Sequence, residues 1–410
     1  MQIIVVGAGA AGMLAAIYAK VKAKNPNNQV TILERNNDCG KKILITGNGH
    51  CNYWNEDQSL TNYHTDDLTK LKEILTLENQ KEILNFFESI GIIPKIKNGY
   101  YYPYSNQAVS VKTALLLKMQ ELGIKVVTNC LVEKITKKND LFELTTNLGS
   151  FRACKVIMAA GSKACPKTGS DGNGYSLLES LGHKLIKVLP ALVQLKSPSK
   201  ILKDWNGIRC DAHLTLEEND EVMLQEEGEV QLTDYGISGI CTLNLSGMVA
   251  KGLDEGKKEV IKIDFLPIIK GDLTTFINWL DDRARLLKKR SLAYLFEGVL
   301  NYKLVFALLK NLKINSARAW SNLNSQEKMA LAQAIKEFRL VISATKDYDN
   351  AQVCQGGVSL KEIDPLTMES KIVPGLYIVG ELLDVDGKCG GYNLSFAWIT
   401  GMLAGKGVQR

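Results

Sequence analysis

The opening residues of this chain, 1–35, decide its fold and read MQIIVVGAGAAGMLAAIYAKVKAKNPNNQVTILER. Residues 2–6 form a short β-branched run, which is typical of a buried parallel strand. A glycine turn follows at once, the next run has the composition of a helix, and residues 29–35 predict a second strand that ends in an acid. This order of elements predicts a complete βαβ unit.

The glycine turn has the spacing G-x-G-x-x-G, which is weak when it stands alone and specific when it joins a strand to a helix. Gly7 is expected to permit the tight turn. Gly9 is expected to let the backbone approach a pyrophosphate, and Gly12 to let the helix pack on the strand. The turn therefore predicts a dinucleotide site.

The start of the helix and the end of the second strand complete this site. Ala10 and Ala11 lie where the helix begins, so its unpaired N–H groups and positive dipole end are available to phosphates. Glu34 ends the second strand and is expected to accept hydrogen bonds from ribose hydroxyls. These features leave NAD and FAD open as the dinucleotide.

The end of the chain repeats the arrangement of strand, turn and helix. Residues 375–405 contain a strand, an acidic turn, a glycine pair and an apolar run with helical spacing. Glu381 or Asp386 is expected to bind the ribityl or pyrophosphate region. Gly391 would let the backbone pass under a flat ring, and a helix beginning near Tyr392 would direct its positive end at that ring.

Glycine-bearing strand ends decide between the two dinucleotides. One follows the strand that ends near residue 158, at Ala160-Gly161, and another is Gly380 near the end of the chain. An NAD dehydrogenase usually completes its nucleotide domain in one continuous stretch, whereas an extended FAD needs contacts along its whole length. The distribution of these turns favours FAD.

The predicted type of element changes three times between the two nucleotide-binding segments. Short alternating strands begin near residue 190 and helical runs near residue 270, and strands return near residue 340. We predict an α/β fold with a two-part Rossmann-like FAD-binding domain, an inserted β-rich, barrel-like domain and an inserted helical domain. The predicted ranges are 1–189 and 357–410 for the FAD-binding domain, 190–269 and 340–356 for the β-rich domain, and 270–339 for the helical domain.

Composition excludes several classes of protein. The 410 residues have a net charge of +6, too weak a bias to predict a nucleic-acid partner or attraction to a membrane surface. No stretch approaches 18 uninterrupted apolar residues, so no membrane span is expected. The nine cysteines are scattered without C-x-x-C or zinc spacing, which indicates reduced cytoplasmic thiols, a buried and inert Cys51, and no metal site.

Several longer motifs carry a resemblance to a known family. They are the glycine turn with Glu34-Arg35, GKKILITGNGHCN (40–52), YPYSNQA (102–108), AAGSKACPKTGSDGNGY (159–175), LTDYGISGI (232–240) and a long run over 356–398. Together they resemble the BaiN-like flavoproteins, the family that includes aminoacetone oxidase and NAD(P)/FAD-dependent oxidoreductases. The resemblance spans nearly the whole chain.

The resemblance implies FAD held between the two ends of the chain. A loop over the ribityl chain and isoalloxazine ring would comprise Lys42, Thr46, Gly47, Asn48, Cys51 and Asn52. Ala160-Gly161 would lie near the adenosine half, and Val132 near the adenine. The flavin end would comprise Glu381, Asp386, Gly391, Tyr392 and Asn393.

These observations predict an FAD-dependent oxidoreductase that transfers a hydride between flavin and a small organic substrate. Two reactions stay open: oxidation of an amine or amino-ketone with O₂, and NAD(P)H-fed reduction of a carbon–carbon double bond. No second nucleotide fingerprint is visible, which favours oxidation or a transient visit by NAD(P)H as electron donor. A flavin-bearing RNA-modification or binding factor is the alternative of another class. The catalytic residues and the oligomeric state stay unassigned, and Tyr102, His50 and Asn393 are candidates for polar groups beside the flavin.

Overall fold

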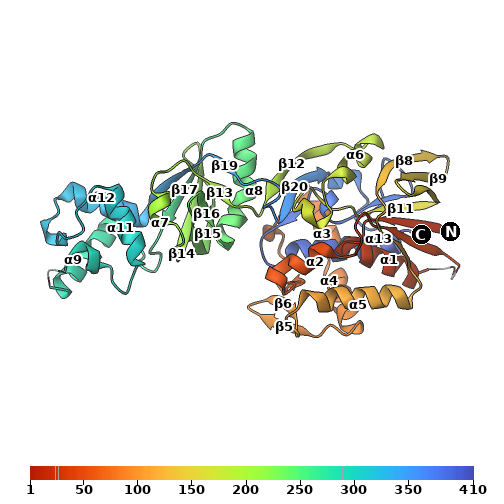
Figure 1. Cartoon of the computed structure of the whole chain (residues 1–410), viewed down its shortest axis with the longest axis horizontal. Helices are drawn as coiled ribbons and strands as arrows, with labels where there is room; N and C mark the ends of the chain where they lie inside the picture. Colours follow the sequence, from red (N-terminus) through yellow and green to blue (C-terminus); the bar gives the residue numbers. More distant parts are fainter. Residues whose placement is uncertain (24, 26, 289) are drawn as a thin grey trace. The chain divides into compact units, whose positions relative to one another are not determined.

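The computed structural model describes residues 1–410 except 24, 26 and 289. The chain forms two compact units (Figure 1). Unit 1 comprises Met1–Leu189 and Gln352–Arg410, and unit 2 comprises Pro190–Ala351. Residues 352–356, which the sequence analysis placed in the β-rich domain, lie in unit 1. Both ends of the chain therefore build one body.

Unit 1 is organised by a five-stranded sheet in which every pairing is parallel. Its order is β21 (Leu376–Ile378), β11 (Lys155–Met158), β1 (Gln2–Val6), β2 (Gln29–Leu33) and β7 (Lys125–Val127). Ile4 stands opposite both Thr31 and Val156, so β1 is central and its side chains are buried on both faces. The predicted Rossmann-like fold class is confirmed.

Helices and small sheets surround this sheet. The helices are α1 (Ala10–Val21), α2 (Lys41–Ile45), α3 (Leu68–Ile74), α4 (Leu77–Ser89), α5 (Ala108–Glu121), α6 (Asn173–Ser180) and α13 (Tyr392–Gly407). One antiparallel sheet has the order β10 (Gly149–Ala153), β9 (Leu141–Thr146) and β8 (Val132–Lys138). Another has the order β3 (Trp54–Asn55), β6 (Tyr100–Pro103) and β5 (Pro94–Lys97). Two further pairs are β22 (Asp386–Gly387) with β4 (Tyr63–His64), and β12 (Leu185–Ala191) with β20 (Val353–Val358).

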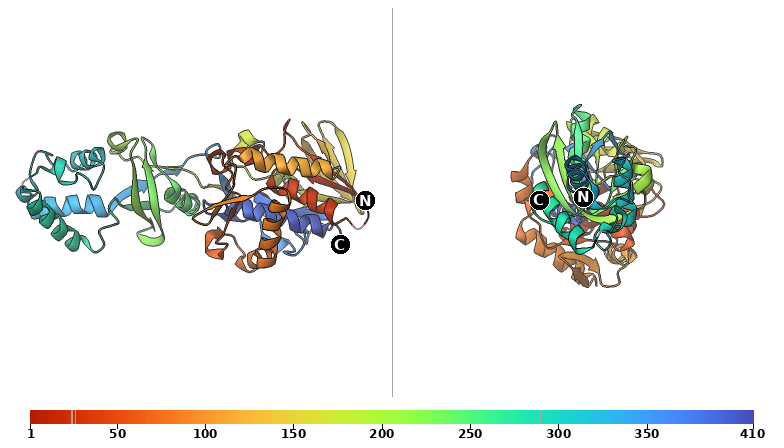
Figure 2. Two further views of the ribbon diagram at one scale, coloured as in Figure 1. Left: turned by 90° about the horizontal axis from the view of Figure 1, so that it is seen from below. Right: turned by 90° about the vertical axis from the view of Figure 1, so that its left-hand side faces the viewer.

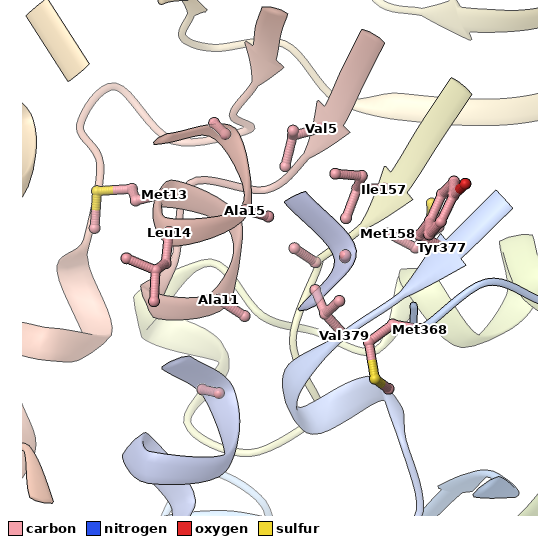
Figure 3. Close-up of a cluster of buried hydrophobic side chains, with 14 of the residues drawn as sticks. Val5, Ala11, Met13, Leu14, Ala15, Ile157, Met158, Met368, Tyr377 and Val379 are labelled. Carbon is pink, nitrogen blue, oxygen red and sulfur yellow. The ribbon is translucent and has the colours of Figure 1, made fainter. Parts of the chain in front are cut away.

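The core of unit 1 lies where α1 packs on the parallel sheet. Figure 3 shows apolar side chains of α1 and of β1, β11 and the β21 segment gathered in one cluster. Burying a large aliphatic side chain stabilises a fold by about 1.5–3 kcal/mol, so this cluster fixes α1 firmly on the sheet. The glycine turn at the start of α1 is therefore held on a rigid base.

The two ends of the chain lie near each other, as Figures 1 and 2 show. The terminal amino group of Met1 donates to the side chain of Asn28 at 3.1 Å. The amide of Asn28 in turn donates to Gln409 Oε1 at 2.9 Å. These bonds fix the end of the closing helix beside the first two strands.

Unit 2 contains a seven-stranded sheet whose pairings are all antiparallel. Its order is β18 (Phe338–Ile342), β17 (Glu259–Asp264), β14 (Arg209–Glu218), β15 (Glu221–Leu232), β16 (Gly236–Ser238), β13 (Leu195–Lys196) and β19 (Ala344–Thr345). The helices are α7 (Leu202–Trp205), α8 (Ile240–Asp254), α9 (Leu273–Leu286), α10 (Leu292–Leu295), α11 (Tyr302–Asn311) and α12 (Ser325–Lys336).

The β-rich and helical insertions share one core in the structure. Trp205, Phe265 and Phe338 form mutual ring contacts with centroids 5.3–6.2 Å apart, and the same cluster includes the buried side chains of α9, α11 and α12. The returning strand β18 begins at Phe338, two residues inside the range predicted as helical. A shared apolar core explains why residues 190–351 form one compact unit.

None of the helices in the described part of the chain combines the length and apolarity that crossing a membrane requires. Among the same residues, no group of three or more His, Cys, Asp or Glu side chains is arranged to hold a metal ion.

Candidate functional site

Four of the predicted site segments meet at one edge of the parallel sheet. Gly7 follows β1, Glu34 follows β2, Gly161 lies just beyond β11, and Gly380 lies just beyond β21. Because these strands are parallel, their carboxyl ends share an edge. After β1 the chain forms β2 and β7 on one side of β1, and it then forms β11 on the other side of β1. This edge is thus a topological switch point, where open α/β sheets bind ligands.

The three fingerprint glycines have different surroundings. Gly7 has φ +101°, and a β-carbon there would stand 2.5 Å from the carbonyl oxygen of Ala159. A β-carbon on Gly12 would overlap the carbonyl oxygen of Gly7, so helix and turn touch directly. Gly9, by contrast, has no heavy atom within 4 Å of the position that a β-carbon would take. Two glycines allow close packing and the third leaves an open cradle.

The open cradle stands at the start of α1. Gly9 is the N-cap residue, no side chain caps the helix, and its first turn, which Ala10 and Ala11 open, contains no acid. The N–H groups of an uncapped first turn are unsatisfied donors at the positive end of the helix. The cradle therefore fits a phosphate group.

Glu34 is buried beside the same turn. Its carboxylate accepts the N–H of Ala8 at 2.7 Å and that of Asn36 at 2.8 Å, which fixes the turn after β1 to the turn after β2. Each carboxylate oxygen has further acceptor capacity, so the expected hydrogen bonds to ribose hydroxyls remain compatible with this geometry. Arg35 points to a different partner, with Nη1 2.6 Å from a carboxylate oxygen of Asp171.

The segments predicted to bind the adenosine half lie around the glycine-rich loop at 169–172. Asn173 donates its side-chain amide to the carbonyl oxygen of Val132 at 3.3 Å. Ser170 donates to the carbonyl oxygen of Ala160 at 3.2 Å and also contacts Gly161, whose φ is +75°. The structure thus brings the ends of β8 and β11 to one loop.

Lys42 and Glu381 join α2 to the turn that follows β21. The Lys42 ammonium lies 2.8 and 2.7 Å from the two carboxylate oxygens of Glu381, and both side chains are partly exposed. Ser162 donates to the same carboxylate at 2.6 Å. Glu381 therefore has protein partners at both oxygens, and its direct role here is to hold Lys42.

Three further residues lie around this ion pair without having been predicted as site residues. They are Ser162, Tyr175, whose hydroxyl donates to the Glu381 carbonyl at 2.9 Å, and Cys354. Burial raises the pKa of the Cys354 thiol to about 11, and a hydrogen bond involving Ser162 partly opposes that shift. Ser162 lies inside a motif already quoted from the sequence, whereas no local signal distinguishes Cys354.

The loop at 46–52 has an unusual backbone. Gly47 and Asn48 have φ of 55°, Gly49 has φ of 86° and Cys51 has φ of 57°, so left-handed conformations dominate it. Such conformations suit Gly and Asn and strain a residue such as Cys. The N–H of Cys51 donates to the carbonyl oxygen of Thr46 at 3.0 Å, which closes the loop. The loop is thus a glycine-asparagine turn with positive φ.

Cys51 and Asn52 are buried at the end of this loop and differ in character. Burial raises the pKa of the Cys51 thiol to about 12, so the thiol stays protonated and inert as expected. Asn52 is 8% exposed, and its Oδ1 atom has no hydrogen-bond partner among the residues that the structure describes. A buried acceptor without a donor is costly unless a ligand supplies one.

Asn52 stands beside the start of α13. Gly391 is the N-cap residue of this helix with φ +95°, and a β-carbon there would stand 3.0 Å from Asn52 Oδ1 and 2.8 Å from the Trp54 carbonyl group. The first turn of α13 has no side-chain cap and no acid. This end therefore places an unpaired acceptor next to unpaired helix donors, which fits the edge of a flavin that carries both N–H and C=O groups.

The other predicted residues at this end stabilise the turn before α13. Asn393 clamps Gly387, accepting from its N–H at 2.9 Å and donating to its carbonyl at 2.7 Å. Asp386 is buried, with a carboxylate oxygen 3.1 Å from His64 Nδ1. The ring of Tyr392 meets that of Tyr63 edge-on, with centroids 5.5 Å apart. These contacts position the turn that carries the glycine pair.

The packing of α13 on α1 sets the offset between the two uncapped helix starts. Gly401 packs on the carbonyl oxygen of Ala11, and Gly405 packs on that of Ala15 at a β-carbon distance of 2.6 Å, so the helices run in the same direction. Gly391 lies ten residues before Gly401, whereas Gly9 lies only two before Ala11. At about 1.5 Å per residue, the start of α13 extends about 12 Å beyond that of α1. This offset suits a cofactor with phosphates at one helix and a ring at the other.

The chain is similar to several known proteins over nearly its whole length. The family described as HI0933-like protein Rossmann domain matches residues 1–407. A 3-dehydro-bile acid delta(4,6)-reductase from Clostridium scindens is 40% identical over 404 residues, covering 98% of this chain and 97% of the relative. A ribosomal RNA dihydrouridine synthase from Escherichia coli is 26% identical over 398 residues, covering 96% of this chain and 94% of the relative.

Solved structures share the fold at low sequence identity. A 3-ketosteroid-delta4-(5alpha)-dehydrogenase from Rhodococcus jostii RHA1, in complex with 4-androstene-3,17-dione, is similar with a TM-score of 0.51 and 12% identity. The similarity covers 100% of this chain and 97% of that structure. At this level of identity the similarity shows the fold alone.

Proposed function

The chain belongs to the HI0933-like Rossmann family and is an FAD-dependent oxidoreductase, and on that basis we propose that it reduces a conjugated carbon–carbon double bond in a small organic substrate. The observation that carries the proposal is the 40% identity, over almost the full length of both chains, to a protein named for reducing double bonds in a 3-dehydro-bile acid. We propose an α,β-unsaturated ketone as the substrate class, because a 3-oxo group next to a Δ4 bond is such a ketone.

The residues of this chain supply binding and polarity for that reaction. When bound, FAD supplies the two-electron chemistry of hydride transfer at its N5 atom. The first turn of α1 would hold the pyrophosphate at the open Gly9 cradle. The first turn of α13, beside Asn52, would place positive helix potential where a reduced flavin gathers negative charge. Positive potential at that position favours the reduced form of the cofactor. A reductase needs this form because it transfers hydride to the substrate.

We propose NAD(P)H as an electron donor that binds transiently and dissociates after it has reduced the flavin. The chain has one G-x-G-x-x-G turn that follows a strand and opens a helix, and the proposal assigns that turn to FAD. A nicotinamide would then bind transiently over the ring. Oxidation of an amine or amino-ketone by O₂ is the second reaction that the flavin could support, and we rank it behind double-bond reduction because the 40% identical relative is named as a reductase.

A nucleic-acid substrate is the second candidate, favoured by the relatives named ribosomal RNA dihydrouridine synthase at 26% identity. Dihydrouridine differs from uridine by saturation of one carbon–carbon double bond conjugated to a carbonyl, so the bond chemistry is the same. The modest charge of +6 supports the small-molecule proposal, because RNA binding is dominated by contacts to phosphates.

Anaerobic half-reactions test the proposal. The purified flavoprotein is reduced with NADH or NADPH. Portions of the reduced enzyme are then mixed with a 3-dehydro-4,6-diene bile acid, with unmodified ribosomal RNA, or with air. In a separate experiment the oxidised enzyme is mixed with aminoacetone. We expect rapid reoxidation by the unsaturated ketone and slow reaction with air. Reoxidation by RNA alone would replace the small-molecule proposal. Bleaching of the oxidised enzyme by aminoacetone, with peroxide released in air, would replace it with the oxidase.

A further inference from the structure

The hairpin of β5 and β6 presents an alternating row of tyrosines to the two glycine-rich segments of the predicted flavin site. A β-carbon on Gly47 would stand 3.5 Å from Cε1 of Tyr102, and one on Gly390 would stand 2.7 Å from Cε1 of Tyr100. Tyr101, between them, contacts the ring of Tyr53 edge-on, with centroids 6.2 Å apart. Since side chains alternate along a strand, Tyr100 and Tyr102 point to one face of the hairpin and Tyr101 points to the opposite face.

Asn52 lies close to both of the glycine-rich segments that this tyrosine face contacts. Its backbone nitrogen would stand 2.7 Å from a β-carbon on Gly47, and its orphaned Oδ1 atom 3.0 Å from one on Gly391. The loop that holds Gly47 and the start of α13 are therefore adjacent, and the tyrosine face lies along both. This places a phenol next to the segments that we propose surround the isoalloxazine ring.

Among His50, Tyr102 and Asn393, Tyr102 is the side chain that is available to donate a proton. Asn393 has both ends of its amide engaged with Gly387, and an amide is no acid at neutral pH. His50 is exposed, and its Nδ1 lies 2.8 Å from the carbonyl oxygen of Asn106. The Tyr102 side chain is half-buried, and no hydrogen bond of its hydroxyl occurs among the residues that the structure describes.

Burial, and secondarily the neighbouring Tyr100 phenol, hold the pKa of Tyr102 above its usual value, so the hydroxyl is protonated at neutral pH. A protonated phenol with a vacant hydrogen-bonding position can donate to a ligand, and positioned acids of this kind accelerate reactions by about 10²–10⁴-fold. The ring of Tyr102 also lies against the Gly47 loop.

We propose that Tyr102 is the catalytic acid that protonates the α-carbon of the unsaturated ketone. This inference rests on the proposed function and identifies the proton donor of the same site. Hydride adds to the β-carbon, and the π electron pair shifts towards the α-carbon. The O–H bond of Tyr102 breaks as its proton forms the new α-C–H bond. The substrate gains two electrons from reduced FAD, and solvent returns a proton to the tyrosinate.

The kinetic test compares Tyr102→Phe with Tyr104→Phe, an exposed neighbour that is 71% accessible and serves as the matched control. Each reduced enzyme is mixed anaerobically with the 3-dehydro-4,6-diene bile acid and, separately, with 4-androstene-3,17-dione. Tyr102→Phe should slow reoxidation about 10²-fold or more while leaving reduction by the nicotinamide unchanged. Tyr104→Phe should match the wild type in both. Reoxidation of Tyr102→Phe within twofold of wild type overturns the assignment.

A second measurement needs no turnover. The full-length apoprotein is nitrated with tetranitromethane with and without FAD, and the modified tyrosines are mapped by mass spectrometry. Tyr102 should be nitrated in the apoprotein and protected by FAD, whereas Tyr104 should be nitrated in both. Equal nitration of Tyr102 in the two samples places it away from the cofactor and overturns the assignment.

The two proposals fail in different ways. If wild-type reduced enzyme is reoxidised by neither ketone, the reductase proposal fails and the role of Tyr102 fails with it. If wild type reacts and Tyr102→Phe reacts equally fast, only the proton donor is wrong. Unchanged FAD affinity and thermal unfolding of Tyr102→Phe, measured on the apoprotein, exclude a folding defect as the cause of a slow reaction.

Discussion

Gly401 of α13 lies directly against the carbonyl oxygen of Ala11 in α1, so close that a β-carbon at 401 would stand less than 3.0 Å from it. This contact fixes the closing helix of the chain to the helix that follows the opening turn. Since both helices present uncapped N-termini, their packing sets the spacing between two donor-rich ends.

Gly401→Ala should force the two helices apart. Overpacking a close contact costs about 1–3 kcal/mol, because neither the Ala11 backbone nor the sheet beneath it can move easily. We expect a lower midpoint in urea unfolding of the apoprotein and weaker FAD binding. Ala397→Gly, on the same helix, is the control. This variant should lose some stability of its own, but its FAD dissociation constant should be unchanged. An unaltered unfolding midpoint in Gly401→Ala would show that the helices are not held by this contact.

Gly9→Ala should have the opposite signature. The position is open within 4 Å, so an added methyl group meets no protein atom and the apoprotein should unfold at the wild-type urea concentration. If the cradle holds the pyrophosphate, the methyl group should weaken FAD binding by about tenfold or more, which is about 1.4 kcal/mol. Fluorescence titration of the apoprotein with FAD measures this. Wild-type affinity in Gly9→Ala would remove the phosphate from this turn.

Glu259 in unit 2 should make stability depend on pH. The side chain is 1% exposed, neither carboxylate oxygen has a hydrogen-bond partner among the described residues, and the pKa is raised from 4.5 to about 7 by burial and then by Glu218. The folded state therefore holds a proton that the unfolded state releases. Stability from this group is complete below pH 4.5 and is lost as pH rises through about 7.

Glu259→Gln should remove that dependence. One pKa unit corresponds to about 1.4 kcal/mol, so the variant should gain up to about 3 kcal/mol over wild type between pH 4.5 and 7 and keep that advantage at pH 8. Urea unfolding at a series of pH values provides the comparison. Parallel wild-type and variant profiles across this window would show that Glu259 ionises as an ordinary surface carboxylate.

Cys51 should resist alkylation in the native protein. The thiol is buried and its pKa is raised to about 12, so almost no thiolate exists at pH 8. Cys154 is exposed and provides the internal reference. Treatment with iodoacetamide followed by peptide mass spectrometry should label Cys154 and leave Cys51 unmodified. Labelling of Cys51 at a comparable rate would indicate that the loop at 46–52 opens.

Local sequence was enough to predict the sheet and its carboxyl edge. The β-branched run at 2–6, the glycine turn and Glu34 are contiguous or nearly so, and their roles depend on backbone geometry that short-range pattern specifies. The parallel pairing of β1 with β2 and β11 follows from that pattern and the handedness of βαβ units.

Long-range partnerships could not be predicted in the same way. Ser162 and Glu381 are 219 residues apart in the sequence, and Cys354 shares their environment; no periodicity encodes that meeting. The orphaned acceptor of Asn52 depends on how a strained loop meets a helix start. The single core of residues 190–351 arises because Trp205, Phe265 and Phe338 converge from separate segments. Such contacts are decided by tertiary packing.

The assembly of unit 1 from both ends of the chain has a consequence for biosynthesis. During translation, α1 leaves the ribosome long before α13, which occupies residues Tyr392–Gly407. At about 5–20 residues per second, the apolar side of α1 waits tens of seconds for its partner. Ribosome-bound nascent chains halted before residue 392 should therefore be unable to retain flavin and should engage holdase chaperones. Yellow colour should first appear once α13 has been synthesised and has left the ribosome.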